Sequence, residues 1–248
     1  MDFSILIRGV IVTTEKNIRI YYKKAPVIIF GILFPIFMFL AFYLGRAIDL
    51  SIFFPGFLAM ALFFTASSVG PLITPWEKQA GTYERLLSFP VTISTIIMGD
   101  MAAGAIFGLV ISSVVLIAGI IFLELIISNL ILLILAMFLG TLCFASFGVL
   151  LAAPSSRAPS NVMMLSSLIR FPLIFVSGIF IPLEKLQGAG RILSYISPLT
   201  YLVDLFHTAL SGNSIMHVSL NCLVLIAFTA FFLFLAGLFH KRNIAKGM

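Results

Sequence analysis

The sequence predicts an all-α membrane protein. We expect six transmembrane helices, an amphipathic interfacial helix at the N-terminus and short re-entrant helices before the last span, all in one domain, 1–248. First, 61% of the residues are hydrophobic and only 10% are charged. Second, the apolar residues fall into runs of about 20, the length of a membrane-crossing helix. Third, these runs are apolar on all sides, whereas the strands of a β-barrel alternate.

The clearest span is Ile215–Phe239, which contains no Asp, Glu, Lys or Arg. As a helix it would be about 37 Å long, enough to cross a hydrocarbon core of about 30 Å with some tilt. Backbone groups in lipid must bond within the segment, which favours a helix. We expect the first span to kink at Pro35. The other five predicted spans are Ala25–Gly45, Ser51–Ile73, Ser94–Leu123, Asn129–Ala153 and Val162–Pro182.

The N-terminal segment, 1–24, has the pattern of a helix lying on the membrane surface. Apolar side chains recur on one face at helical spacing: Phe3, Ile7, Val10, Ile11, Ile18 and Tyr22. Basic side chains share another face: Arg8, Lys16, Arg19 and Lys23. A basic polar face opposite an apolar one is typical of an interfacial amphipathic helix.

The basic residues predict the orientation. If the N-terminus is cytoplasmic, Arg46, Lys185 and Arg191 are external and Arg170 lies within a span, which leaves eleven of the fifteen Lys and Arg in cytoplasmic segments. This asymmetry favours a multi-pass protein of the cytoplasmic membrane with both termini cytoplasmic. It also explains the net charge of +6 without nucleic-acid binding.

A polar segment, 76–91, separates the second and third predicted spans on the cytoplasmic side. Its centre reads as a short helix that Thr82 could cap and Pro90 would end. Exposed apolar residues among charges are typical of a docking surface, although an ordinary loop packed on the membrane is the alternative. The candidate residues are Tyr83, Glu84, Arg85, Leu86, Leu87, Phe89 and Pro90.

Two ionisable residues, Asp100 and Arg170, fall at membrane depth, where charges are costly and usually paired or functional. One hypothesis is an ion pair between them, within one subunit or between two. An alternative is that each reaches the inner head groups, above all Asp100. A third has Arg170 contacting an anionic lipid head group or substrate.

Smaller patterns give weaker predictions. Gly104 and Gly108 have the spacing that permits close helix packing. Cys143 and Cys222 lie inside apolar runs and suggest neither a disulfide nor a metal site. His207 and His217 have no partners at metal-ligand spacing.

The segment 183–214 is too polar to cross the membrane but contains helical patches. Gly188 and Gly190 interrupt it, and Ser197 followed by Pro198 reads as the start of a helix. We interpret Glu184, Arg191 and Asp204 as interfacial anchors first and gate residues second.

Three stretches in this order resemble the ABC-2-type permeases, the membrane subunits of one class of ATP-binding-cassette exporters: 83–91 (YERLLSFPV), 161–184 (NVMMLSSLIRFPLIFVSGIFIPLE) and 197–204 (SPLTYLVD). The resemblance implies a dimer, most simply a homodimer, bound to two ATPase subunits. The segment 76–91 would be the coupling loop to the ATPase. Two short helices in 183–214 would form an external gate segment, with Glu184, Pro198, Tyr201 and Asp204.

The sequence contains no phosphate-binding G-x-x-x-x-G-K-[ST] motif, so we expect it to bind no cofactor and a separate subunit to use the ATP. The predicted function is the permease of an exporter that moves an amphipathic or bulky substrate, such as a drug, lipid or glycan. Besides the ATPase and a second permease, membrane lipid is the expected partner. An ion-coupled secondary transporter is the alternative, supported only by Asp100. An intramembrane enzyme would need paired catalytic residues that the sequence lacks.

Overall fold

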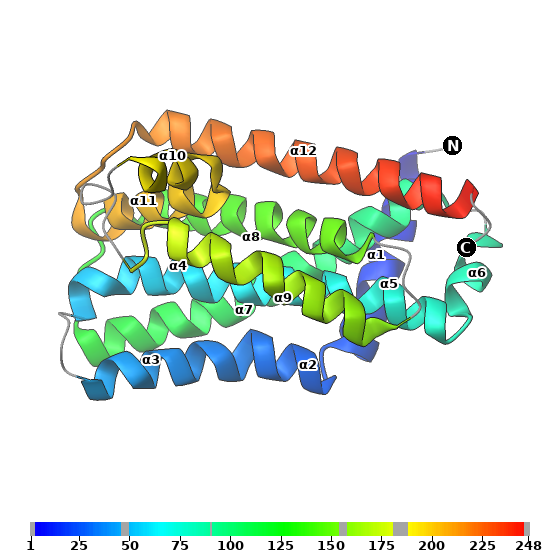
Figure 1. Ribbon diagram of the computed structural model, residues 1–248, viewed down its shortest axis with the longest axis horizontal. Coiled ribbons are helices and arrows are strands. Elements are labelled where there is room, and N and C mark those ends of the chain that lie inside the picture. Colours follow the sequence, from blue (N-terminus) through cyan, green and yellow to red (C-terminus); the bar gives the residue numbers. More distant parts are fainter. Residues whose placement is uncertain (1–2, 46–49, 90, 154–157, 181–187, 246–248) are drawn as a thin grey trace.

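The computed structural model describes residues 3–45, 50–89, 91–153, 158–180 and 188–245, and these ranges contain helices and connecting turns but no strand. The long helices run side by side along one axis and form an elongated bundle (Figure 1). The chain is therefore an all-α membrane protein, as the sequence predicts.

The helices follow the predicted runs closely. The first seven elements along the chain are α1 (Phe3–Tyr21), α2 (Ala25–Ile28), the π-helical turn η1 (Ile29–Leu33), α3 (Phe34–Gly45), α4 (Leu50–Ser68), α5 (Gly70–Gln79) and α6 (Thr82–Leu87). The rest are α7 (Ile93–Leu123), α8 (Leu130–Ala152), α9 (Pro159–Val176), α10 (Ala189–Ile196), α11 (Pro198–Ser211) and α12 (Val218–Ala245).

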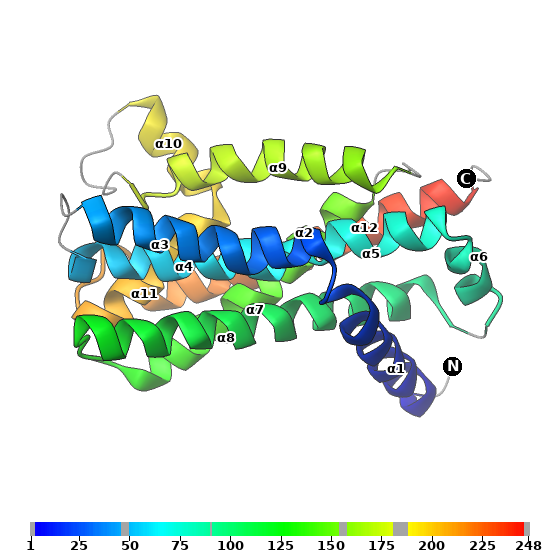
Figure 2. The ribbon, with the colours of Figure 1, turned by 90° about the horizontal axis from the view of Figure 1, so that it is seen from below.

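Five described segments are long and apolar enough to cross a membrane. They are Phe53–Gln79, Ile93–Leu123, Leu130–Ala152, Pro159–Val176 and Val218–Arg242. The number reaches the predicted six when the pair Ser4–Tyr21 and Ala25–Ala41, bent by 90°, is counted as one span. This bend makes α1 leave the end of the bundle sideways (Figure 2).

Ahead of Pro35, where we predicted a kink, the helix contains the π-helical turn η1, which ends just before α3. Proline has no N–H, and its ring crowds the carbonyl four residues earlier, here Gly31. A wider turn ahead of the proline relieves this conflict without ending the helix.

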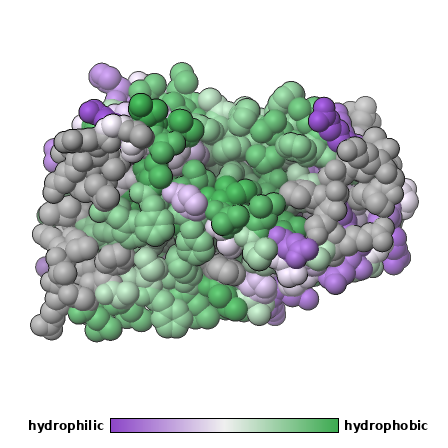
Figure 3. Space-filling view, in the orientation of Figure 1, coloured by the Kyte–Doolittle hydropathy of each residue, from purple (hydrophilic) through white to green (hydrophobic). Residues whose placement is uncertain are grey.

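The core lies around α4, whose Leu58, Leu62 and Phe63 are fully buried. Phe63 contacts Phe144 edge-on, with ring centroids 4.9 Å apart. Hydrophobic side chains also cover most of the middle of the face shown in Figure 3, whereas strongly hydrophilic ones lie toward its ends. A surface of this kind suits a hydrocarbon surrounding, because lipid does not penalise exposed apolar side chains.

The close packing predicted for Gly104 and Gly108 is confirmed. Both face Ala66 of α4, so closely that a Cβ on Gly104 would lie 2.8 Å from the Ala66 carbonyl oxygen and one on Gly108 2.7 Å from the Ala66 Cβ. A still closer contact joins α5 to α8, where a Cβ on Gly70 would lie 2.4 Å from the Gly148 carbonyl carbon.

Three predicted span ends are wrong. The second span continues through α5 to Gln79 rather than ending at Ile73, because the buried Glu77 and Lys78 find partners on other elements. The last span begins at Val218 rather than Ile215, because a buried carboxylate holds the preceding turn in a non-helical form, as described below. The fifth span, α9, ends at Val176 within the described residues rather than at Pro182.

Candidate functional site

The short helix α6 lies at the same end of the bundle as the first and last described residues (Figure 1). It begins after Gly81, whose positive φ of 68° suits glycine, which lacks a Cβ. Gly81 is the capping residue, so the cap predicted at Thr82 is wrong. The Thr82 hydroxyl instead donates to the Glu77 carbonyl over 3.3 Å, and Pro90 lies outside the described residues.

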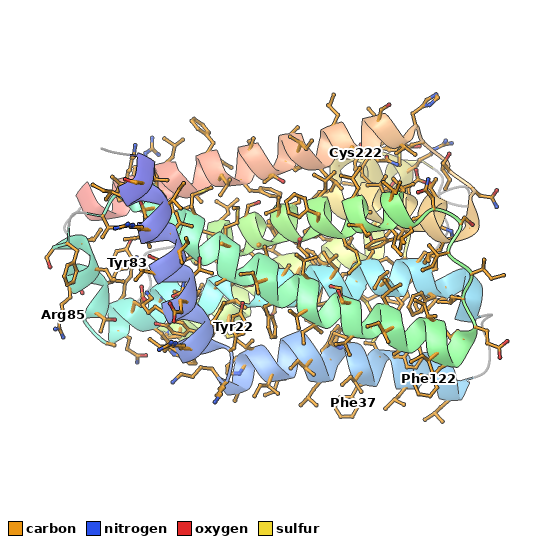
Figure 4. All side chains as sticks on the ribbon, turned by 180° about the vertical axis from the view of Figure 1, so that it is seen from behind. Tyr22, Phe37, Tyr83, Arg85, Phe122 and Cys222 are labelled. Atoms are coloured by element: carbon orange, nitrogen blue, oxygen red, sulfur yellow. The ribbon has the colours of Figure 1, made fainter. Side chains whose placement is uncertain are left out.

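The two faces of α6 differ in exposure. Glu84 and Arg85 are exposed, and Phe89 just beyond the helix is 61% exposed. Leu86 and Leu87, which we expected to be exposed, are half-buried. Tyr83 is 1% exposed and lies toward the bundle, whereas Arg85 points away from it (Figure 4). The helix therefore presents a small charged and apolar surface held by one buried tyrosine.

Tyr83 connects α6 to two other helices. Its hydroxyl lies 3.3 Å from Nδ1 of His240 in α12. The Lys78 ammonium of α5 lies 5.6 Å from the centre of its ring, a cation–π contact. Burial raises the pKa of the Tyr83 phenol well above its usual value, so the hydroxyl stays protonated. The exposed surface of α6 is thus attached to α5 and α12.

A second group of polar residues lies on α1, α5 and α7. We call it the basal cluster: Lys16, Asn17, Thr74, Glu77 and Asp100. The Lys16 ammonium forms an ion pair with the Glu77 carboxylate. The Asn17 amide donates to Asp100 Oδ1 over 2.7 Å, and the Thr74 hydroxyl donates to Oδ2 over 3.4 Å. Buried carboxylates need such donors, because removal from water is costly. The cluster therefore joins α1, α5 and α7.

Sequence reasoning missed most of this cluster, because it interpreted α1 only as a surface helix with an apolar face and a basic face. The buried face is polar instead, formed by Thr13, Thr14 and Asn17, whereas Ile7 and Ile11 are exposed. Membrane lipid can cover isoleucines, but Asn17 needs the Asp100 carboxylate. The spacing of Thr13, Thr14 and Asn17 on one helical face was the signal that could have revealed it.

The predicted ion pair between Asp100 and Arg170 is not formed within the chain. Asp100 is 2% exposed and bound in the basal cluster, so it does not reach toward head groups either. Arg170 binds Ser166, with Nε 3.3 Å from the carbonyl oxygen and Nη2 2.5 Å from Oγ. The guanidinium carbon lies 5.8 Å from the centre of the Phe64 ring.

At the other end of the bundle, Asp204 of α11 is buried and hydrogen-bonded, not exposed as an interfacial anchor would be. Its carboxylate accepts hydrogen bonds from the backbone N–H of Ile215 at 2.9 Å and Met216 at 3.0 Å, and from the Asn221 amide at 2.7 Å. Arg191 in contrast is exposed, as an interfacial anchor would be. The interpretation of Asp204 as an anchor is therefore wrong.

The remaining residues of the predicted external segment hold α10 and α11 together. The Tyr201 hydroxyl donates to the Tyr195 carbonyl over 2.8 Å, and Pro198 is the buried first residue of α11. Ser197 precedes the helix, but its side chain makes no capping bond. Glu184 lies outside the described residues.

Within the described ranges, no three His, Cys, Asp or Glu residues lie close enough to hold a metal ion. Cys143 and Cys222 are both free thiols.

These features define a multi-pass helical membrane protein that carries a small charged helix at the end where the first and last described residues lie. The family model for the ABC-2 type transporter matches residues 8–211, from α1 through α11, and the chain belongs to this family. It is thus a permease component of an ABC transporter, a class that associates with an ABC ATPase subunit. This membership favours the permease over the ion-coupled alternative. No curated protein matches the chain.

Proposed function

We propose that the chain is the permease subunit of an exporter that moves an amphipathic or bulky substrate, such as a drug, lipid or glycan, across the cytoplasmic membrane. Two copies of the chain, as a homodimer, would form the path, and two copies of a separate ATPase would supply the energy. The observation that carries the proposal is α6, which exposes Glu84, Arg85 and Phe89 at one end of the bundle while Tyr83 anchors it.

The contacts around α6 support a route by which an ATPase could move the spans. A push on α6 reaches α12 through Tyr83 and His240. It reaches α5 directly, because only a short turn separates the two helices, and it continues to α1 through Glu77 and Lys16. A packed and hydrogen-bonded path of this kind transmits displacement because its members cannot move independently.

The proposed orientation puts the α6 end in the cytoplasm, with both chain termini. Eleven of the fifteen Lys and Arg belong to segments at this end by the predicted topology. The positive-inside rule favours that side. An ATPase bound there would have access to cytoplasmic ATP, which this chain, lacking a phosphate loop, leaves to its partner.

Co-purification tests this function. The chain, tagged, is co-expressed with a candidate ATPase encoded beside its gene, and both retention of the ATPase and its hydrolysis rate are measured. We expect a stable complex, with Glu84→Lys and Phe89→Asp each reducing retention at least tenfold. The matched control is Arg191→Glu, a charge reversal at an exposed site on the opposite end, which should retain the ATPase fully. Full retention by both α6 variants would contradict the proposal.

A further inference from the structure

Arg170 is a cation buried deep in a membrane-spanning helix. Its side chain is 0% exposed, and it lies eleven residues after Pro159, roughly 17 Å along α9 from the start of that helix. At this depth no bulk water is available to its N–H groups, so their partners must come from protein or from a bound molecule. A buried charge without such partners is costly.

The chain supplies hydrogen-bond partners to only some of the N–H groups of the Arg170 guanidinium. Ser166 accepts two of its hydrogen bonds, and Phe64 gives a cation–π contact, but Nη1 is buried with no partner. No carboxylate in the described ranges offsets its charge. The acidic residues there bind other groups or lie exposed near the ends of the bundle: Glu15, Glu77, Glu84, Asp100, Glu124 and Asp204.

The position of α9 indicates where an anion could come from. This helix lies at the margin of the bundle in Figure 2. The neighbours of Arg170 along the chain, Ile169 and Phe171, are 38% and 37% exposed, and Leu168 is 69% exposed. Arg170 itself is buried, and the residues on either side of it in α9 face the hydrocarbon. A molecule approaching here would need an apolar part for these residues and an anionic group for Arg170.

We infer that Arg170 and Ser166 form a binding site for the anionic head group, a phosphate or carboxylate, of an amphipathic molecule that enters from the bilayer beside α9. A guanidinium suits both groups, because its N–H groups can donate to two oxygens at once. The inference rests on the proposed function, and it narrows the substrate class to anionic amphipaths if the occupant is a transported molecule. The occupant is either a bilayer lipid or a transported molecule with the same head-group chemistry.

The test measures ligand-induced stabilisation of the chain alone, in discs of zwitterionic phosphatidylcholine, with octyl phosphate as the probe. At a hundredfold excess over its Kd, we expect octyl phosphate to raise the Tm by roughly 5–10 °C and neutral octyl glucoside to leave it unchanged. Arg170→Met should weaken binding about 10- to 100-fold through loss of charge-assisted bonds. Arg170→Lys keeps the charge but loses the planar pair of N–H donors, so its affinity for octyl phosphate should lie between those of the unmodified chain and Arg170→Met.

Discs containing phosphatidylglycerol distinguish the two sources. If this lipid raises the Tm through Arg170 and removes the response to octyl phosphate, a bilayer lipid is the occupant. If octyl phosphate still shifts the Tm in these discs, a molecule other than the resident lipid occupies the site. Both results support the inference.

Ser166→Ala keeps the fold and the Arg170 cation but removes the hydroxyl that orients the guanidinium. This variant should bind octyl phosphate several-fold more weakly, and it tests the inference even if Arg170→Met fails to fold. Arg191→Met, at an exposed arginine, should bind octyl phosphate normally. Equal Tm shifts in the unmodified chain, Arg170→Met and Ser166→Ala would overturn the inference. So would an equal shift with inorganic phosphate, which has no apolar part.

Two further results would overturn it by revealing another counter-anion. If the unmodified chain does not respond to octyl phosphate and Glu184→Gln does, the counter-anion of Arg170 is a carboxylate of this chain. If octyl phosphate fails to bind the unmodified chain and Arg170→Met splits a dimer, the counter-anion is a carboxylate of a second copy. Since no step requires an ATPase, failure of this test is distinguishable from failure of the proposed function.

Discussion

Asp204 is the residue on which the end of the bundle opposite α6 depends most directly. Its buried carboxylate accepts three hydrogen bonds from the turn and helix that follow α11. Two of the donors are backbone N–H groups ahead of α12, where a helix leaves its first donors unsatisfied. A single carboxylate therefore sets both the turn that follows α11 and the start of the last span.

Replacement of Asp204 by asparagine should destabilise the protein by about 2–4 kcal/mol, because the amide has only one accepting oxygen and brings two donors into a site already full of donors. Thermal unfolding of the purified chain in detergent measures the effect. Glu124→Gln, the same chemical change at an exposed position of the same end, should leave the Tm within error. Equal Tm values for the two variants would refute the assigned role of Asp204.

At the scale of elements, polar contacts hold α1 to the bundle in addition to the packing of Tyr21 against Trp76. The ion pair from Lys16 to Glu77 and the bond from Asn17 to Asp100 join it to α5 and α7. The basal cluster contains one cation and two carboxylates, so Lys16 is electrostatically central. An amphipathic helix fastened in this way can shift together with the spans it contacts.

A double-mutant cycle tests whether the ion pair between Lys16 and Glu77 stabilises α1 on the bundle. Lys16→Met should cost about 3–5 kcal/mol, because it leaves two buried carboxylates without a cation. Glu77→Gln should cost less, because Lys16 then still offsets Asp100. The double variant should be more stable than the sum of the single effects implies, with a coupling free energy of about 1–3 kcal/mol from unfolding measurements. Strict additivity would mean that the pair does not stabilise α1 on the bundle.

The contact between α5 and α8 leaves no space for a methyl group at Gly70, since the nearest atoms belong to the Gly148 backbone. Gly70→Ala should therefore separate the helices and cost about 1–3 kcal/mol, visible as a lower Tm or a lower yield of folded protein. Gly237→Ala is the matched control in α12, where nothing lies within 4 Å of the added carbon. A Gly70→Ala variant as stable as this control would contradict the close approach.

The accuracy of the sequence predictions also varies by element. Long apolar runs such as Ile93–Leu123 are evident without a structure, because lipid selects for continuous hydrophobicity. The buried partners are not, because Asn17 and Asp100 lie 83 positions apart and nothing local indicates their contact. For the same reason Glu77 reads as a loop residue until Lys16 is placed beside it. Local patterns thus predict spans, whereas pairing across helices determines where those spans end.

For the whole molecule, the described termini and α6 share one end, and α10 and α11 lie at the other (Figure 1). This arrangement predicts opposite labelling of Ser88→Cys and Asn213→Cys, both exposed positions, by a membrane-impermeant maleimide. In intact cells only Asn213→Cys should react, whereas both should react after permeabilisation. The native Cys143 and Cys222 lie within spans and serve as the unreactive background. Labelling of Ser88→Cys in intact cells would reverse the orientation.

The central claim is that α6 is the surface on which an ATPase acts, and site-specific photo-crosslinking tests it most directly. A photoreactive amino acid replaces Arg85 on the exposed face of α6, and a second chain carries it at Arg191 on the exposed surface of α10. The account predicts an adduct between the Arg85 position and the co-expressed ATPase and none from the Arg191 position. An ATPase that copurifies but crosslinks only from Arg191, or equally from both positions, would contradict the account.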